Sequence, residues 1–234
     1  GGKYRLIDFP LSSLANAGIR SVFGIFQQDN ISSVFDHIRS GREWGLSTLL
    51  SHYYLGIYNT PVDSSTVDKE YYHQILTYLK RSGSDQTVAL NSDVLVNIDL
   101  NQVFHLHNVT KQKVTVVYKK LPKELISDVN SILDIDESDK VLKHELFQGG
   151  DKEVYNMSID IFVVDTPFLI EKLEEEAAKE EPRKLRYVLR DLAVAENAFA
   201  YEHTGYLSNI HSVKSYFDAN LDMLESQKFY SLFA

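Results

Sequence analysis

Short apolar runs alternate with amphipathic helical patterns along most of this 234-residue chain. The apolar runs occupy residues 21–26, 86–91, 114–119 and 155–164. Their length and their content of β-branched residues are typical of buried strands. Apolar residues recur at helical spacing in residues 30–41, 67–80 and 100–107, after residue 167, and in residues 183–192. Alternation of this kind favours an α/β fold with a mainly parallel sheet and helices on both faces.

The remaining segments predict a hairpin, an irregular stretch and two terminal elements. Residues 131–147 alternate apolar and polar side chains around a polar turn, which indicates an antiparallel hairpin. Residues 43–66 show no clear period, and we expect a long irregular segment near a site. Residues 4–9 are expected to be extended and to lead, through a proline, into a short helix over 11–18. A final helix is predicted from Ser212 to about Glu225.

Composition and charge exclude several classes of protein. Lysine and arginine total 24 against 33 aspartate and glutamate, and the resulting charge of −9 argues against a general nucleic-acid binder. The sequence contains no cysteine, which excludes disulfides and thiolate chemistry and fits a reducing, cytoplasmic setting. No run approaches the roughly eighteen apolar residues of a membrane span. The chain opens without Met or a signal-peptide pattern, and we expect it to be part of a longer protein.

Asp93 is the strongest candidate site residue that position alone indicates. It follows directly after the apolar run at 86–91, and open α/β sheets bind ligands beyond the carboxyl ends of their strands. A carboxylate there could hold Mg²⁺ between phosphate groups, although a capping or turn aspartate fits the same pattern. Gly1, Gly2 and Lys3 combine flexible backbone donors with a cation, which suits phosphate but is more often a plain turn.

Four segments resemble one family over nearly the whole chain. They are residues 1–12 (GGKYRLIDFPLS), 16–20 (NAGIR), 156–162 (NMSIDIF) and 215–222 (SYFDANLD). The first is similar to the GGK-aromatic-RIIDFxLSN segment of the ADP-glucose pyrophosphorylases, the glucose-1-phosphate adenylyltransferases. The resemblance implies a Rossmann-like nucleotidyltransferase domain with a mixed, mainly parallel sheet, of which residues 1–234 form a part. It also implies that the family's glycine-rich ATP loop and its C-terminal β-helix domain lie outside this sequence.

Several residues at the positions where this family binds its ligands are different in the present chain. The resemblance places the family's two metal-binding aspartates at Asp93, which is kept, and at Asn209, which is neutral. Leu207 stands where the family has tryptophan, and Asn156 stands where it has serine. Loss of one of two carboxylates weakens a site for a hard cation. No intact catalytic site is therefore expected, and Asp93 is expected to bind metal weakly at most.

Two longer ligand motifs of the family also have no counterpart. Residues 62–66 (VDSST) replace the family's G-T-A-D-A sugar and nucleotide motif, and residues 143–147 (KHELF) lack the sugar-phosphate lysine of its E-K-P motif. The packing segments match while the ligand-gripping residues are lost. This pattern is similar to the GlgD-type subunit of bacterial glycogen biosynthesis, as is the segment at 56–62 (GIYNTPV).

The resemblance thus implies a regulatory or weakly catalytic subunit in the cytoplasm, which assembles with and activates a catalytic ADP-glucose pyrophosphorylase subunit, or self-associates. It implies Mg²⁺ as a cofactor only if activity is retained, sugar phosphates as possible effectors, and neither nucleic acid nor membrane as a partner. A second hypothesis is an active glucose-1-phosphate adenylyltransferase, which makes ADP-glucose and pyrophosphate from ATP and glucose 1-phosphate. A third hypothesis is a stand-alone sugar-phosphate sensor.

Overall fold

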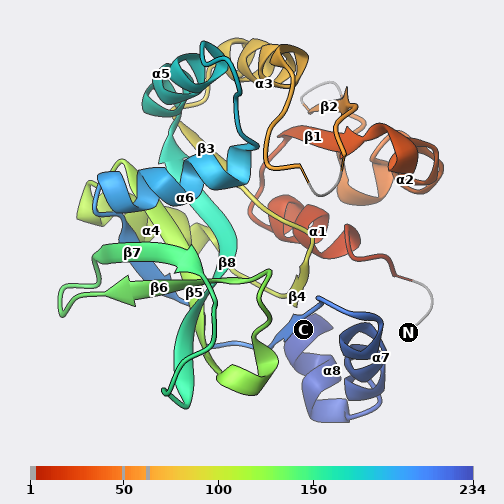
Figure 1. The fold of residues 1–234 in the computed structure, drawn as a ribbon. Coiled ribbons are helices and arrows are strands. Elements are labelled where there is room, and N and C mark those ends of the chain that lie inside the picture. The colour runs from red at the N-terminus through yellow and green to blue at the C-terminus, as the bar shows by residue number, and fades with distance from the viewer. Residues whose placement is uncertain (1–3, 49–50, 62–63, 234) are drawn as a thin grey trace. The chain divides into compact units, whose positions relative to one another are not determined.

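The computed structural model describes residues 4–48, 51–61 and 64–233, in which helices and strands alternate along the chain (Figure 1). The chain forms two compact units. The first comprises the described parts of Gly1–Ser13, Val88–Val163 and Arg190–Ala234, and the second those of Leu14–Thr87 and Val164–Leu189. Residues of both units occur in helices α1 (Asp8–Asn16) and α6 (Leu185–Ala195) and in strands β3 (Gln86–Ala89) and β8 (Val154–Asp165).

The first unit is built on a six-stranded sheet. Its strand order is β7-β6-β8-β5-β9, and β3 pairs with β8 beside this path. The further strands are β5 (Val114–Pro122), β6 (Ser131–Ile135), β7 (Val141–Leu146) and β9 (Phe199–Glu202). Strand β5 runs parallel to β9, whereas β6 runs antiparallel to both β7 and β8. The α/β class, the mixed sheet and the 131–147 hairpin are confirmed, and β6 has antiparallel neighbours on both sides.

Strands β5 and β8 form the core of this sheet. Val114, Val116 and Val117 of β5 are fully buried, and so are the consecutive residues from Ile161 to Val163 of β8. Buried side chains on successive positions mean that both faces of these strands are covered. Helix α4 (Leu100–Thr110) contacts β5 and buries Val103 completely.

Two short strands, a 3-10 turn and two C-terminal helices complete the first unit. Strands β4 (Val94–Val96) and β10 (Leu207–Asn209) pair antiparallel, and the 3-10 turn η3 (Lys123–Leu125) follows β5. The hydroxyl of Ser212 caps α7 (Val213–Asp222), as predicted, but this helix ends before Glu225 and is followed by a further helix, α8 (Ser226–Phe233). Strands β4 and β10 and helix α8 were not anticipated, since three-residue strands and a short second helix leave little periodic signal.

The second unit pairs two strands and packs two longer helices. Strand β1 (Ser21–Gln27) runs parallel to β2 (His52–Tyr58), and helix α3 (Lys69–Ser82) contacts α5 (Thr166–Ala177). Helix α2 (Ile31–Ile38) lies between the 3-10 turns η1 (Gln28–Asn30) and η2 (Arg42–Trp44). The side chain of Asp68 caps α3 by accepting a hydrogen bond from the N–H of Tyr71, and Gly83 ends the helix with a positive φ of 62°.

Two of the expected segments differ from the structure. The irregular segment predicted over 43–66 contains β2, which forms because its residues pair one by one with β1. The extended stretch predicted over 4–9 is wrong, because α1 already begins at Asp8, whose carboxylate accepts the N–H of Arg5 at 2.8 Å. Pro10 is tolerated in the first helical turn, where its missing N–H is not needed. Over the described residues, no helix has both the length and the apolar character needed to cross a membrane.

Candidate functional site

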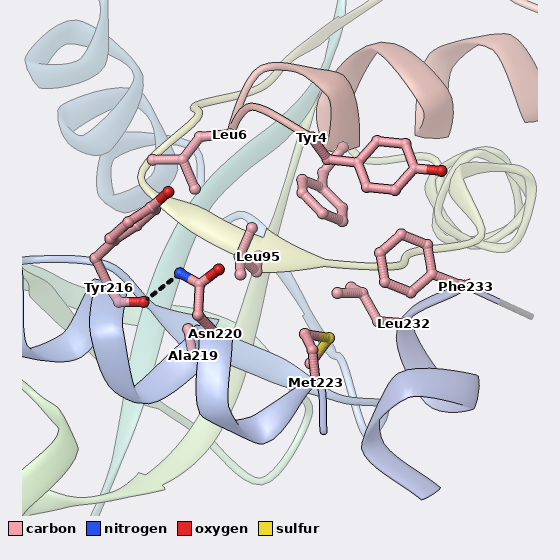
Figure 2. A pocket seen from close by; sticks show the side chains of 10 residues that line it. Tyr4, Leu6, Leu95, Tyr216, Ala219, Asn220, Met223, Leu232 and Phe233 are labelled. Atoms are coloured by element: carbon pink, nitrogen blue, oxygen red, sulfur yellow. Dashed lines mark hydrogen bonds between the residues drawn. The ribbon is translucent and has the colours of Figure 1, made fainter. Parts of the chain in front are cut away.

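A shallow groove lies in the first unit among β4, α7, α8, the residues before α1 and the first turn of α1 (Figure 2). Its lining consists of Tyr4, Leu6, Phe9, Leu95, Tyr216, Ala219, Asn220, Met223, Leu232 and Phe233. The groove has a volume of about 40 Å³, whereas pockets for small ligands usually measure ~300–1,000 Å³. It is therefore too small and too apolar for a sugar phosphate or nucleotide, and the polar residues beside β4 and β10 are the better candidates.

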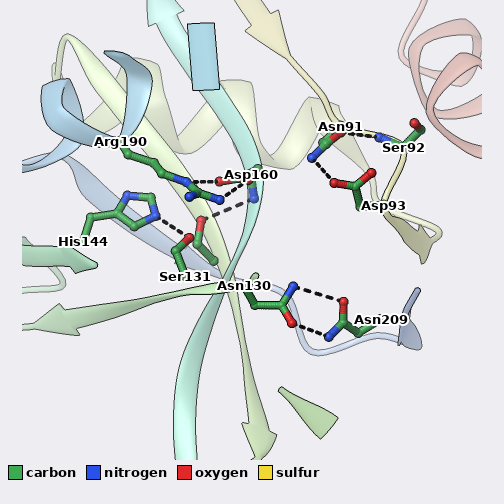
Figure 3. A network of polar contacts seen from close by, with 10 residues as sticks. Asn91, Ser92, Asp93, Asn130, Ser131, His144, Asp160, Arg190 and Asn209 are labelled. Atoms are coloured by element: carbon green, nitrogen blue, oxygen red, sulfur yellow. Dashed lines mark hydrogen bonds and ion pairs between the residues drawn. The ribbon is translucent and has the colours of Figure 1, made fainter. Parts of the chain in front are cut away.

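Asp93 lies on the turn between β3 and β4, with its side chain exposed (Figure 3). The Nδ2 group of Asn91 donates to the Asp93 carboxylate at 2.7 Å, and the N–H of Ser92 donates to Asn91 Oδ1 at 2.9 Å. The backbone carbonyl of Asp93 accepts a hydrogen bond from the N–H of Ile210 at 2.9 Å. The structure thus places this carboxylate in the short turn that follows β3, directly before β4 and beside the end of β10.

Asn209 lies on β10 opposite Val94, the residue that follows Asp93. Its side chain is buried, with the residue only 8% exposed. Its Nδ2 donates to Oδ1 of Asn130 at 2.7 Å and to the carbonyl of Leu125 at 2.9 Å, and its Oδ1 accepts from Nδ2 of Asn130 at 3.2 Å. Both ends of the Asn209 amide are therefore engaged inside the fold (Figure 3).

These residues do not fit the two-carboxylate magnesium site that the family resemblance implies. Asn209 carries no charge, and its oxygen is already an acceptor for the Asn130 amide. In the part of the chain that the structure describes, no group of three or more His, Asp or Glu side chains could hold a metal ion. Hard divalent cations in proteins are bound mainly by carboxylate oxygens.

The other positions named from the sequence are packed rather than gathered around Asp93. Leu207 is half-buried on β10 opposite Val96. Asn156 is half-buried on β8, and its Nδ2 donates to the carbonyl of Leu133 at 3.4 Å. At the end of the 143–147 segment, Phe147 is buried and contacts the ring of Tyr155. The candidates Gly1, Gly2 and Lys3, and the motif residues Val62 and Asp63, lie outside the described residues.

A buried ion pair joins β8 to α6, and sequence reasoning missed it. The guanidinium of Arg190 donates to both carboxylate oxygens of Asp160, from Nε at 3.0 Å and from Nη2 at 2.6 Å (Figure 3). Asp160 adopts a positive φ of 51°, which aspartate tolerates better than most residues. The available signal was one charged residue, Asp160, within the apolar run at 155–164, which does not identify the partner 30 residues away.

His144 lies on β7 close to this pair. Its Nε2 is 2.9 Å from the hydroxyl of Ser131, its ring stacks on Phe162, and its buried Nδ1 makes no hydrogen bond within the described part of the chain. Burial lowers the pKa of His144 to about 4; the Asp160 charge raises it in part, and the Arg190 charge lowers it further. The ring is therefore neutral near pH 7.

The chain is similar to known proteins over most of its length. The nucleotidyl transferase family matches residues 1–226. The chain is 26% identical to the glucose-1-phosphate adenylyltransferase of Thermosipho africanus, over 95% of this chain and 55% of that protein. It is 27% identical to the enzyme of the same name from Trichlorobacter lovleyi, over 96% of this chain and 59% of that protein. The chain thus spans little more than half the length of these relatives.

A solved structure shows the same fold. The crystal structure of a putative glucose-1-phosphate thymidylyltransferase from Bacillus anthracis, in complex with a sucrose, superposes with a TM-score of 0.71. The similarity covers 94% of this chain and 82% of that one at 15% sequence identity. The Rossmann-like α/β fold expected from the sequence is thereby confirmed.

Proposed function

Because this chain belongs to the nucleotidyl transferase family, we propose that it is a regulatory or weakly catalytic subunit of the ADP-glucose pyrophosphorylase type. It assembles with a catalytic paralogue and raises that subunit's activity. The observation that carries the proposal is the Asn209 amide, which is neutral, buried and bound to Asn130 and Leu125. An active member of the resembled family presents a carboxylate at this position.

The proposal follows from the electrostatics of nucleotidyl transfer. The triphosphate of ATP and the phosphate of glucose 1-phosphate repel each other, and bound Mg²⁺ normally offsets this charge. In this chain Asp93 keeps its carboxylate at the edge of β4, while Asn209 contributes none. Phe147 is buried at the end of the segment where the family's sugar-phosphate lysine is expected. The charged side chains that would bind metal and phosphate are therefore fewer, while the buried core of the sheet is kept.

An active glucose-1-phosphate adenylyltransferase is the competing hypothesis, and two observations favour it. The relatives named above carry that activity in their names, and Asp93 remains exposed after β3. In that case the chain alone would release pyrophosphate from ATP and glucose 1-phosphate. The enzyme would then rely on Asp93 as its remaining metal-binding carboxylate.

The experiment compares the purified chain, an active paralogue and their mixture, with pyrophosphate release as the measurement. We expect the chain alone to turn over at least about 100-fold more slowly than typical enzymes of ~10 s⁻¹, and the mixture to exceed the paralogue alone. Asp93→Asn is the matched variant, since it removes the remaining charge at an exposed position. It should leave the stimulation unchanged if this chain acts through assembly.

Two outcomes would contradict the proposal. Rapid pyrophosphate release by the chain alone that Asp93→Asn abolishes would identify an active enzyme. Neither co-elution with the paralogue nor stimulation of it would instead favour the stand-alone sensor, which calorimetry with glucose 1-phosphate and other sugar phosphates would then test.

A further inference from the structure

The turn that carries Asp93 contains an Asn-Ser pair, Asn91 and Ser92. Asparagine is a thermolabile residue, and it reacts most readily when a small residue follows, because the backbone nitrogen of that residue can then reach the side-chain amide carbon. The sequence contains a second Asn-Ser pair, Asn130 and Ser131, at the start of β6, and it contains no Asn-Gly pair. The two pairs therefore offer the same local chemistry in two different folded settings.

Two hydrogen bonds fix the orientation of the Asn91 amide. Its Nδ2 donates to the carboxylate of Asp93 at 2.7 Å, and its Oδ1 accepts the N–H of Ser92 at 2.9 Å (Figure 3). An ionised carboxylate only accepts hydrogen bonds, so the amide must turn its nitrogen to Asp93 and its oxygen to Ser92. Because Oδ1 is bonded to Cγ, this contact holds the backbone nitrogen of Ser92 next to the amide carbon. It also directs the N–H proton at the oxygen that gains negative charge when that nitrogen attacks.

The amide of Asn130 is held by other partners. Its Oδ1 accepts from the N–H and the hydroxyl of Ser127 at 2.9 and 3.0 Å and from Nδ2 of Asn209 at 2.7 Å, and its Nδ2 donates to Oδ1 of Asn209 at 3.2 Å. Within the described residues, no hydrogen bond joins this amide to the N–H of Ser131, which is buried in the sheet. Asn91 and Asn130 are both half-buried, so the contacts of their amides, rather than their exposure to water, distinguish the two pairs.

We propose that Asn91 is a deamidation site in the folded protein. The backbone nitrogen of Ser92 loses its proton and bonds to Cγ of Asn91, the bond between Cγ and Nδ2 breaks, and ammonia leaves with that proton. Solvent water then opens the resulting succinimide ring at one of its two carbonyl carbons, which leaves aspartate or isoaspartate at position 91. The turn is accessible to this water, because the Asp93 side chain on it is exposed. An intramolecular step of this kind is fast when the reacting atoms are already held close together.

The reaction changes the charge of the candidate site. It replaces the amide that donates to Asp93 by a second carboxylate, so that two negative charges stand close together and each disfavours the other. The isoaspartate product also lengthens the backbone by one carbon atom between β3 and β4. The proposal goes beyond the function proposed above and does not depend on it, since it concerns only the chemistry of this turn.

The test incubates the 234-residue chain near neutral pH in heavy-oxygen water and locates the incorporated label by peptide fragmentation in a mass spectrometer. The label marks only the residues that deamidate during the incubation. In the folded chain we expect conversion at Asn91 to be at least about ten-fold faster than at Asn130, since only Asn91 has its attacking nitrogen in place. In concentrated urea these contacts are lost, and the two Asn-Ser pairs should convert at similar rates. Conversion at Asn91 should be at least as fast in the folded chain as in urea.

A pair of variants tests the contact that orients the amide. Asp93→Ala removes the acceptor of Asn91 Nδ2 and should slow conversion at Asn91 in the folded chain roughly ten-fold. Asp151→Ala is the matched control, because Asp151 is also an exposed aspartate in a loop of the first unit, and it should leave the rate unchanged. Circular dichroism checks that both variants are folded.

Three results would overturn the proposal. Slower conversion at Asn91 in the folded chain than in urea would show that the fold protects this residue. Equal conversion at Asn91 and Asn130 in the folded chain would show that the amide contacts do not matter. A rate at Asn91 that Asp93→Ala leaves unchanged would show that Asp93 does not position the amide.

Discussion

Replacing Asn209 by aspartate restores the carboxylate of the resembled family, yet we expect it to destabilise this protein. The Asn209 amide donates to the carbonyl of Leu125 at 2.9 Å and to Oδ1 of Asn130 at 2.7 Å, and an ionised carboxylate can donate to neither. Each lost hydrogen bond costs about 1 kcal/mol. The new charge is also buried and faces two acceptor oxygens, which adds a desolvation and repulsion cost of ~1–3 kcal/mol. The expected loss of unfolding free energy is therefore about 3–5 kcal/mol.

Asn130 cannot relieve this loss by rotating its amide. Its Oδ1 also accepts hydrogen bonds from the N–H and the hydroxyl of Ser127, at 2.9 and 3.0 Å. Rotation would offer the Asn130 amide nitrogen to the new carboxylate but would break both bonds to Ser127. The surroundings of Asn209 are therefore specific for an amide, and a single substitution does not return the site to a metal-binding form.

Urea unfolding at pH 7 measures the change in unfolding free energy. The slope of that free energy against urea concentration shows whether the compactness of the folded and unfolded states has stayed the same. Burial raises the pKa of the introduced carboxyl group, so the loss should shrink as the pH falls and the protonated carboxyl can donate again. Asp93→Asn is the control, and it should cost less than about 1 kcal/mol because Asp93 is exposed. An Asn209→Asp protein as stable as the wild type, or one that Mg²⁺ strongly stabilises, would refute the reasoning.

Two further predictions concern the buried polar groups of the first unit. His144, with its pKa lowered from 6.5 to about 4, excludes a proton that the unfolded chain binds, so wild-type stability should fall by ~2–3 kcal/mol as the pH drops from 6.5 to 4. Acid unfolding followed by circular dichroism measures this dependence of stability on pH. His144→Gln should weaken the dependence and leave the smaller contribution of buried His203, whereas His105→Gln, at an exposed site, should not change it. An unchanged dependence in His144→Gln would show that His144 is not its source. Asp160→Asn keeps a residue that tolerates the positive φ but removes the buried carboxylate charge that pairs with Arg190, so thermal or urea unfolding should show a loss of about 3 kcal/mol. A loss below 1 kcal/mol would contradict a stabilising role for this ion pair.

Local patterns in the sequence were sufficient for the elements whose stabilising partners lie nearby. The β-branched run in β5 predicted a buried strand, and Val114 to Val117 are indeed buried. The hairpin over 131–147 was predicted from alternation, and its turn is held by Asp136, whose side chain accepts the N–H groups of Ser138 and Lys140. In both segments, strand propensity, alternation and turn chemistry lie within a few residues of one another.

Elements that depend on a distant partner were not predictable in this way. Strand β2 has aromatic residues but no clear alternation, and it forms because β1, some 30 residues earlier, offers a full row of backbone partners. Helix α8 carries exposed aromatic residues that give no clear core face, so its period is hard to recognise. Tertiary contacts override weak local propensity in such segments.

The same distinction between local and tertiary determinants applies to the candidate site. The sequence alone determined that Asp93 follows a strand and that a neutral residue stands at 209. Both are local properties, because they depend only on residue identity and on position along the chain. Only the tertiary structure decided that Asn209 is held by Asn130 and Leu125, and that Asp160 pairs with Arg190. These contacts join residues 30 to 84 positions apart in the chain, and a hydrogen bond depends on where the folded backbone places its two ends.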